Sequence, residues 1–316
     1  MGVFWQTLFH IMNGMKYPFD KDLAPFRHFH PPLFRGILSP ASLLLKLAPK
    51  GFHKDKVAVE RIEIDGIRMN IITPRGLEKE TTPLLFYIHG GGFFFRAALY
   101  HYQNEESFAL NGRCRVVDCD YSLLPKHYFP IQREECLKVY RYLHEHRKEL
   151  RLDMEHVLFA GDSAGGSLCL DTYLRAQEEG LPLPEGMMLF YPVVTPEAVG
   201  SSKKQFVDTP CWDAKSDEKM WKLYLKRQTY LSPLKRLDEF SLEHLYLETC
   251  EFDCLKDEGL ALYRGLENQV GHKELFETKG TFHGFDSVKK AKISQETKKR
   301  RLLFLSEVIS MWKKEI

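Results

Sequence analysis

The sequence lacks an excess of charge of either sign. Its 316 residues include 45 Lys and Arg against 43 Asp and Glu, for a formal net charge of +2. An even balance of this kind gives no electrostatic footprint for nucleic acid or for an anionic membrane surface. The sequence also lacks a run of about 20 apolar residues, which a transmembrane helix requires. We therefore expect neither a nucleic-acid partner nor a membrane partner.

Cysteine is scarce, and the seven cysteines form no recognisable pattern. They show neither C-x-x-C spacing nor the Cys/His spacing of a zinc finger, so we expect no metal site. Free cysteines are typically small buried side chains, and this usage indicates a reducing compartment. The first ten residues lack the basic region of a signal peptide, and Gln6, Thr7 and His10 interrupt their apolar character. The expected location is the cytoplasm.

From about residue 57 onward, short apolar runs alternate with longer amphipathic ones. Two segments of period-two alternation, 57–64 and 67–72, flank Asp65-Gly66, which predicts a β-hairpin. Further strands are predicted at 84–88, 116–120, 157–160, 187–191, 245–249 and 274–278, and helices at 102–111, 131–150, 165–179, 257–268 and 295–313. This alternation predicts an α/β fold with a mostly parallel eight-stranded sheet flanked by helices.

One glycine-rich motif stands at the junction of a predicted strand and a predicted helix. It reads Gly161-Asp162-Ser163-Ala164-Gly165-Gly166 and fits G-x-S-x-G. A strand–turn–helix elbow of this kind exposes its serine at the top of the sheet, and the helix N-terminus favours negative charge beside it. The rival interpretation is a phosphate-binding loop. It fails because Ser167 and Leu168 replace the Lys and Ser/Thr that such a loop needs.

A second glycine run follows the predicted strand 84–88. It reads His89-Gly90-Gly91-Gly92-Phe93. Glycines can turn successive backbone N–H groups into one cavity, and a tetrahedral acyl intermediate needs such preset donors for its oxyanion. We predict that Gly91, Gly92 and Ala164 supply these donors. We expect His89 to orient the loop rather than to carry a proton.

A nucleophilic serine needs a base, and the base needs an acid to orient it. In a parallel sheet, functional residues lie beyond the carboxyl ends of the strands. His283 follows the last predicted strand, whereas His244 and His272 precede strands and lie at the wrong end. Asp253 is the first aspartate after the strand 245–249. Asp257 and Glu258 follow it, but they are typical of the first turn of the next helix.

The predicted catalytic residues are therefore Ser163, Asp253 and His283, which occur in the chain order of α/β-hydrolases. With these residues in view, the sequence resembles the hormone-sensitive-lipase-like branch of that family, which includes bacterial acetyl esterases. The resemblance covers about residues 55–315. It is carried by the two glycine motifs, by the segment 253–259, by His283-Gly284-Phe285, and by the segments 120–125 and 129–130.

The resemblance implies a carboxylester hydrolase with the α/β-hydrolase fold, a helical cap and no cofactor. Two aromatic-rich segments lie outside the α/β alternation, and an ordered lid would use such aromatics for packing. We therefore expect residues 1–50 to form an N-terminal cap segment. Residues 51–316 would then form the catalytic domain, with a cap insertion at about 195–231.

Several residues depart from the family's usual pattern, namely Arg96, Ser122, Leu124, Lys126 and Cys254. They leave the shape of the substrate pocket open. We expect a small-molecule ester substrate with an acetyl to butyryl group. An amidase or peptidase of the same fold stays an alternative, as does a catalytically silent small-molecule receptor. The oligomeric state is not fixed by the sequence, and a homodimer stays open.

Overall fold

The computed structural model describes residues 16–30 and 51–315, with side chains as far as Trp312. Within these residues the chain forms one sheet of eight strands: β1 Val57–Ile64, β2 Ile67–Pro74, β3 Thr82–Ile88, β4 Arg115–Asp120, β5 Leu152–Asp162, β6 Gly186–Phe190, β7 Leu242–Phe252 and β8 Val270–Phe282. Their spatial order is β1-β2-β4-β3-β5-β6-β7-β8. The pairs β1–β2 and β2–β4 are antiparallel and the others are parallel, which confirms the predicted sheet.

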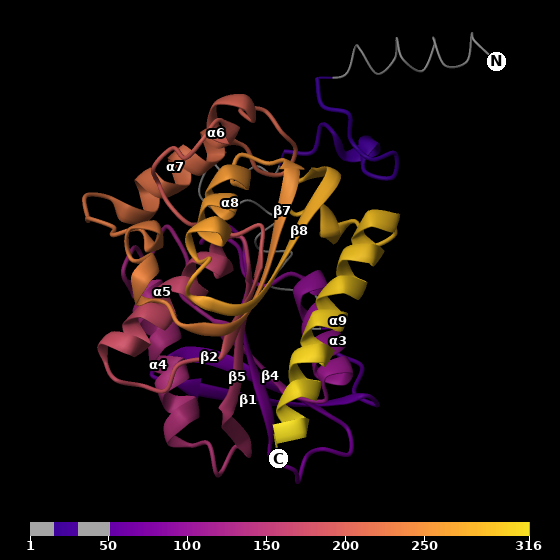
Figure 1. Ribbon diagram of the computed structural model, residues 1–316, viewed down its shortest axis with the longest axis vertical. Coiled ribbons are helices and arrows are strands. Elements are labelled where there is room, and N and C mark those ends of the chain that lie inside the picture. Colours follow the sequence, from indigo (N-terminus) through magenta and orange to yellow (C-terminus); the bar gives the residue numbers. More distant parts are fainter. Residues whose placement is uncertain (1–15, 31–50, 316) are drawn as a thin grey trace, which may run out of the picture.

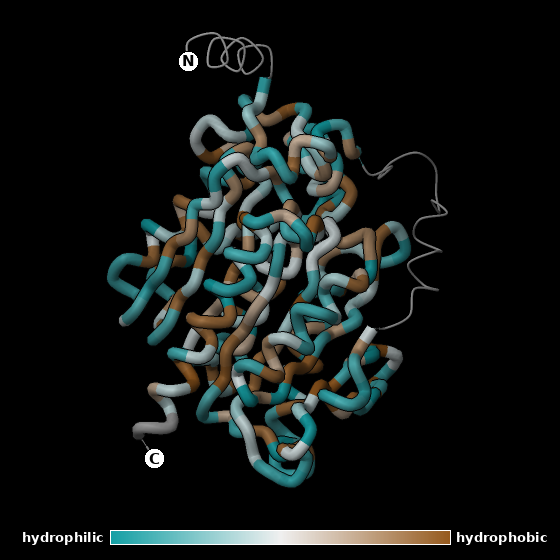
Figure 2. The backbone as a smooth tube through the Cα atoms, turned by 90° about the vertical axis from the view of Figure 1, so that its right-hand side faces the viewer, coloured by the Kyte–Doolittle hydropathy of each residue, from teal (hydrophilic) through white to brown (hydrophobic). Residues whose placement is uncertain are grey.

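Helices cover both faces of the sheet (Figure 1). One face carries α4 Ile131–Glu145, α5 Ala164–Glu178 and α8 Lys256–Gly265, and the other carries α3 Leu99–Gly112 and α9 Lys292–Glu315. Each face has its own buried apolar cluster, and the inner strands run through hydrophobic stretches of the chain (Figure 2). Strands such as β6 are buried at every residue because helices cover them on both sides.

Strand β5 is longer than its sequence pattern predicts. It begins at Leu152 rather than at residue 157. The polar residues Asp153, Glu155 and His156 occupy its first half, where the strand is partly exposed. Polar side chains are tolerated at such positions, so the apolar run that marks a buried strand begins only afterwards.

The insertion between β6 and β7 is ordered and partly helical. It contains α6 Ser202–Gln205 and α7 Ala214–Leu225, followed by the 3₁₀ turns η2 Pro233–Lys235 and η3 Leu237–Glu239. Asp213 is the N-cap of α7, and its carboxylate accepts a hydrogen bond from the Ser216 N–H at 2.7 Å. Figure 1 shows α6 and α7 above the same end of the sheet as the carboxyl end of β7.

The described part of the N-terminal segment contacts this insertion. The Lys16 ammonium lies 2.6 Å from the Asp208 carboxylate, and the Tyr17 hydroxyl donates to the same carboxylate at 2.6 Å. The Cys211 N–H donates to the Phe29 carbonyl at 2.7 Å. Residues 1–15 and 31–50 of the predicted N-terminal cap lie outside the described residues.

Candidate active site

Ser163 lies in the sharp turn between β5 and α5. Its backbone has φ 52° and ψ −120°, a region that side-chain-bearing residues rarely adopt and that costs roughly 1–3 kcal/mol. Three backbone hydrogen bonds hold it there. The Ser163 N–H donates to the Phe190 carbonyl at 2.9 Å, and the Ser163 carbonyl accepts from Gly166 at 3.0 Å and Val193 at 2.9 Å.

The glycines of the elbow allow strand and helix to approach closely. A Cβ on Gly161 would lie 2.6 Å from the backbone carbon of Gly165. A Cβ on Gly165 would lie only 1.9 Å from the carbonyl oxygen of Ile88 at the end of β3. The turn that presents Ser163 therefore depends on both glycines, since no larger residue fits without moving backbone atoms.

The fold brings together the three residues that the sequence singles out. The Ser163 hydroxyl oxygen lies 2.8 Å from Nε2 of His283, and Nδ1 of His283 lies 2.7 Å from Oδ2 of Asp253. Ser163 follows β5, Asp253 follows β7 and His283 follows β8, so all three lie at the carboxyl edge of the sheet. All three are buried. This chain of contacts can pass the hydroxyl proton of the serine to the imidazole.

Asp253 tunes the imidazole beside it. Burial alone would lower the pKa of His283, but the charge and the hydrogen bond of Asp253 outweigh burial and hold that pKa above its usual value. The other carboxylate oxygen of Asp253 accepts from the Leu255 N–H at 3.0 Å, which fixes the carboxylate in place. The ring of Tyr191 packs edge-on against His283, with centroids 5.0 Å apart.

The competing acids are used elsewhere. One carboxylate oxygen of Asp257 accepts from the backbone N–H groups of Ser201 and Ser202, at 2.6 and 2.8 Å. Glu258 accepts from the Val194 N–H at 2.7 Å and lies 2.9 Å from the Lys203 ammonium. Both residues therefore anchor the insertion to α8 instead of approaching His283.

The competing histidines also lie away from this cluster. His244 and His272 are register partners near the starts of β7 and β8, at the opposite end of the sheet from Ser163. Their rings pack edge-on, with centroids 6.1 Å apart. As the strand order predicts, His283 lies at the same end of the sheet as Ser163, and His244 and His272 lie at the other end.

The loop after β3 holds two of the predicted oxyanion donors. Gly91 and Gly92 have φ values of 118° and 59°. A residue with a side chain would be strained in this conformation, whereas glycine adopts it readily. The loop is closed by hydrogen bonds from Phe94 and Phe95 to the Gly91 carbonyl, at 3.0 and 3.1 Å. Within the described chain no protein oxygen accepts from the N–H of Gly91 or Gly92. Ala164 is the first residue of α5, where the helix itself offers its N–H no partner.

His89 lies inside the same loop. Its Nδ1 is 2.7 Å from the Gly90 carbonyl, and its ring stacks on Tyr121 with centroids 4.5 Å apart. Burial, together with the charge of His101, lowers the pKa of His89 to about 4. The ring is therefore neutral near pH 7, and its contacts are those that an orienting residue requires.

Sequence reasoning missed a buried network around Asp162, the residue before the serine. Its carboxylate accepts from the Tyr87 hydroxyl at 2.7 Å and from the Gly90 N–H at 3.0 Å, and it lies 3.2 Å from Nε2 of His101. Burial would raise the pKa of Asp162, but the charge and hydrogen bond of His101 and the hydrogen bond of Tyr87 hold it well below its usual value. Asp162 thus ties the elbow to the glycine loop.

The insertion lies directly over the site. A Cβ on Gly92 would lie 2.8 Å from the ring of Trp212, and that ring is 6.1 Å from the His283 ring between centroids. Tyr224 of α7 stacks on Phe93 with centroids 3.9 Å apart. The sequence indicated an aromatic lid here, but it gave no signal that Trp212 in particular covers the glycine loop.

Comparison with known proteins identifies the family. A family model described as an alpha/beta hydrolase fold matches residues 85–287. This chain belongs to the α/β-hydrolase family. Hormone-sensitive lipase of Mus musculus is 31% identical to it over 168 residues, which are 52% of this chain and 22% of that protein. Esterase LipI of Mycobacterium tuberculosis is 26% identical over 250 residues, 76% of this chain and 77% of that protein.

The solved structures give the same assignment. Bacterial heroin esterase matches this α/β-hydrolase with a TM-score of 0.79 and 28% identity, covering 92% of this chain and 98% of that one. The predicted hormone-sensitive-lipase-like branch and the predicted fold are both confirmed. The hydrolase spans about a fifth of the length of hormone-sensitive lipase itself.

Three further features concern metal binding, membrane insertion and the state of the cysteines. Among its described residues, no group of three or more His, Cys, Asp or Glu side chains is arranged to hold a metal ion. No helix in the described ranges is both long and apolar enough to cross a bilayer. All seven cysteines are free, and all but the half-buried Cys211 are buried.

Proposed function

We propose that this hydrolase cleaves carboxylic esters with short acyl groups, through a covalent acyl-enzyme on Ser163. The observation that carries the proposal is the chain of contacts from Ser163 to His283 at 2.8 Å and from His283 to Asp253 at 2.7 Å. It lies beside the backbone N–H groups of the glycine loop that follows β3. A nucleophile, a base, an orienting acid and oxyanion donors are the four parts that acyl transfer requires.

In the first half of the reaction, the Ser163 oxygen attacks the ester carbonyl carbon while its proton moves to Nε2 of His283. The carbonyl oxygen becomes an oxyanion, which the N–H groups of Gly91, Gly92 and Ala164 stabilise. Asp253 keeps Nδ1 of His283 protonated and stabilises the imidazolium. The bond to the alcohol oxygen then breaks, and His283 returns the proton to the leaving alcohol.

In the second half, water replaces the alcohol. His283 takes a proton from water, and the water oxygen attacks the acyl carbon on Ser163. Collapse of this second tetrahedral intermediate breaks the acyl–serine bond and releases the carboxylic acid, and the proton on His283 returns to the serine oxygen. The enzyme ends in its starting protonation state, so it needs no co-reactant besides water.

The aromatic cover over the site supports a preference for small acyl groups. Trp212 lies against Gly92, and Tyr224 stacks on the neighbouring Phe93. Rigid rings limit the space beside the acyl carbon, so acetyl to butyryl groups fit and longer chains collide. In this proposal residues 195–231 form the cap of a catalytic domain spanning 51–316, and residues 1–50 belong to the same cap.

Two other functions use the same fold. An amidase or peptidase would use the same three residues on a poorer leaving group. A silent receptor would lack one of them or would hold them apart. The intact contacts of Ser163, His283 and Asp253 favour an enzyme over a receptor, and the ester is the less demanding substrate.

The test compares p-nitrophenyl acetate with p-nitroacetanilide, which share an acyl group and differ in the bond that is cleaved. We expect hydrolysis of the ester and little hydrolysis of the anilide. Ser163→Ala should abolish turnover. Ser306→Ala is the matched control, because Ser306 is a half-buried serine on α9 whose hydroxyl bonds only within its helix. Faster cleavage of the anilide would favour the amidase, and no turnover of either would contradict an enzyme.

A further inference from the structure

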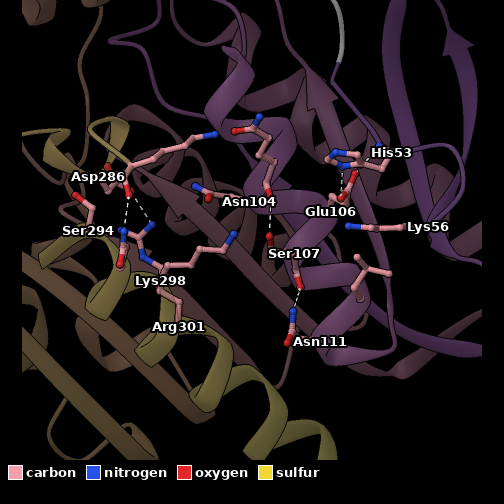
Figure 3. A pocket seen from close by; sticks show the side chains of 14 residues that line it. His53, Lys56, Asn104, Glu106, Ser107, Asn111, Asp286, Ser294, Lys298 and Arg301 are labelled. Carbon is pink, nitrogen blue, oxygen red and sulfur yellow. Dashed lines mark hydrogen bonds and ion pairs between the residues drawn. The ribbon is translucent and has the colours of Figure 1, made fainter. Parts of the chain in front are cut away.

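A pocket of about 460 Å³ lies on the face of the sheet that α3 and α9 cover. Its walls come from the segment before β1, from α3, and from the turn and first helical residues of α9 (Figure 3). Ser163 does not line it. The pocket is therefore separate from the proposed catalytic site, and its size falls within the range of about 300–1,000 Å³ that is common for small-molecule sites.

Three lysines line this pocket without an ion pair. They are Lys56, Lys289 and Lys298. Among the described residues, no carboxylate lies within ion-pair distance of their ammonium groups. Figure 3 shows Lys56 and Lys298 entering from different walls, so the charges converge on the cavity from more than one element.

The carboxylates in the pocket wall are already engaged. Glu106 accepts from the His53 N–H at 2.6 Å and lies 2.8 Å from Nδ1 of His53. Asp286 accepts from the Tyr191 hydroxyl at 2.6 Å and lies 2.7 Å from the Arg301 guanidinium. Arg301 is itself paired with a second acid, Glu248. The pocket lining therefore carries Lys56, Lys289, Lys298 and Arg301 against Glu106 and Asp286, so positive charge is in excess there.

The undescribed residues that precede β1 supply no carboxylate side chain. Residues 1–15 and 31–50 contain neither Asp nor Glu. Residues 31–50, which precede His53 and Lys56 of the pocket wall, therefore bring no acidic side chain with them. All three lysines are exposed, so water solvates their ammonium groups, and an anion that enters the pocket would meet an excess of positive charge.

The start of α9 adds to the positive potential. Lys292 begins the helix, and no acidic residue occurs in its first turn. A helix N-terminus carries partial positive charge, and the Asp22 carboxylate, which accepts a hydrogen bond from the Lys292 N–H at 3.1 Å, offsets part of it. Burial lowers the pKa of both Lys289 and Lys298, and the neighbouring Lys298 charge lowers the pKa of Lys289 further.

We infer that the pocket between α3 and α9 binds a small molecule through a phosphate or pyrophosphate group, at Lys56, Lys289 and Lys298. Several separated cations match a multiply charged anion with several oxygens better than a single carboxylate. Lysine ammonium groups bind phosphate as point charges, and the neutral side chains of Asn104 and Ser294 add hydrogen-bonding groups to the walls. Both a free phosphorylated compound and a phospholipid headgroup present this chemistry.

The test is calorimetric titration of the full chain with inorganic pyrophosphate at constant ionic strength. Three proteins are compared: the wild type, Lys289→Gln/Lys298→Gln, and Lys290→Gln/Lys299→Gln. The last pair removes the same charge from the same segment, but neither residue lines the pocket. We expect saturable binding by the wild type and the control, and binding at least about tenfold weaker in the pocket variant. Equal thermal unfolding of all three shows that the variants fold.

A second titration uses phosphatidylcholine vesicles with and without phosphatidic acid. If the protein binds only vesicles that contain phosphatidic acid, and if only the pocket variant loses this binding, the phosphate group belongs to a lipid headgroup. Binding of pyrophosphate alone assigns it to a soluble compound. Equal weakening in the pocket variant and the control would show general charge attraction only and would overturn the inference. The absence of saturable binding by either probe would overturn it as well.

Discussion

Asp253, His283 and Ser163 form a buried chain of polar side chains that are joined to one another by hydrogen bonds. Burying a carboxylate is costly unless it is hydrogen-bonded, and Asp253 accepts from the Leu255 N–H and from the imidazole. The same contacts keep one tautomer of His283, with the lone pair of Nε2 directed at the serine. The position and the charge of Asp253 together orient His283 and raise its pKa, as its proposed role as the base requires.

The rate should depend on pH through His283. The base accepts a proton only when it is neutral, and Asp253 holds its pKa above the usual 6.5. We therefore expect kcat/KM for p-nitrophenyl acetate to rise with pH and to reach half its maximum above pH 6.5. Asp253→Asn should move this midpoint down and lower kcat by about 10⁴-fold, as expected for loss of the orienting acid. A rate that is constant from acid to alkaline pH would exclude a histidine base.

The identity of the base can be tested with two histidines. His283→Ala should lower kcat/KM by about 10⁴–10⁶-fold, because no other base reaches Ser163. His272→Ala should keep nearly all activity, since His272 lies near the start of β8 at the opposite end of the sheet. Steady-state hydrolysis of p-nitrophenyl acetate measures both. A dead His272 variant beside an active His283 variant would refute the assignment.

At the scale of elements, the elbow between β5 and α5 joins three parts of the fold. Gly165 of α5 packs against the end of β3, and Asp162 at the end of β5 binds the glycine loop that follows β3. Ser163, the proposed nucleophile, and the glycine loop after β3 are therefore held by the same contacts. A change in the helix–strand distance would disturb both.

Two helical glycines give a matched test of this packing. Gly165→Ala places a Cβ 1.9 Å from the Ile88 carbonyl, so we expect a loss of at least about 3 kcal/mol of stability and loss of esterase activity. Gly259→Ala on α8 places a Cβ 3.2 Å from a methyl group of Thr249, and its better helix propensity offsets that contact. Chemical denaturation should find it within about 1 kcal/mol of the wild type. Wild-type stability in Gly165→Ala would contradict the packing described.

The sequence predicts most of this arrangement for a physical reason. In a parallel sheet the strand order along the chain decides which loops meet at the carboxyl edge, so residues after β5, β7 and β8 come together wherever the strands are recognisable. Ser163, Asp253 and His283 could be selected on that basis. The start of β5 could not, because polar residues at its partly exposed end hide the apolar pattern.

Other features depend on contacts that no local pattern encodes. Asp162 meets Tyr87 and His101, which come from different segments, and the motif gives no sign that its aspartate is paired. Trp212 lies in an insertion without strand signals, and only the path of the chain places its ring on Gly92. Tertiary packing decides such contacts, so the structure was needed to find them.

At the scale of the whole molecule, the sheet provides a rigid edge and the inserted segment covers it. Lys203 of α6 lies 2.9 Å from both Asp217 of α7 and Glu258 of α8, which fastens the cover to the helix after Asp253. Tyr17 and Phe29 of the N-terminal segment contact the same cover. The cover is thus tied both to α8 and to the N-terminal segment.

This cover should set the length of acyl chain that is accepted. Each methylene that fits gains about 0.8 kcal/mol of burial until the chain meets the aromatic wall. We expect kcat/KM to be highest for acetyl to butyryl esters and to fall steeply before decanoyl. Trp212→Ala should shift the optimum to longer chains, whereas Trp312→Ala, in α9 on the other face, should not. A p-nitrophenyl ester series from acetyl to palmitoyl measures the profile, and a lauroyl optimum in the wild type would refute the closed pocket.

Ser163 is the proposed nucleophile on which every step of the acyl-transfer mechanism depends. Labelling the full chain with a fluorophosphonate, followed by peptide mass spectrometry, tests this role most directly, because this reagent reacts with serines that a neighbouring base activates. The account predicts one phosphonyl group per chain, on Ser163, and none in Ser163→Ala or after prior protonation of His283 at low pH. An unlabelled wild type, or labelling at a different serine with Ser163 unmodified, would contradict the account.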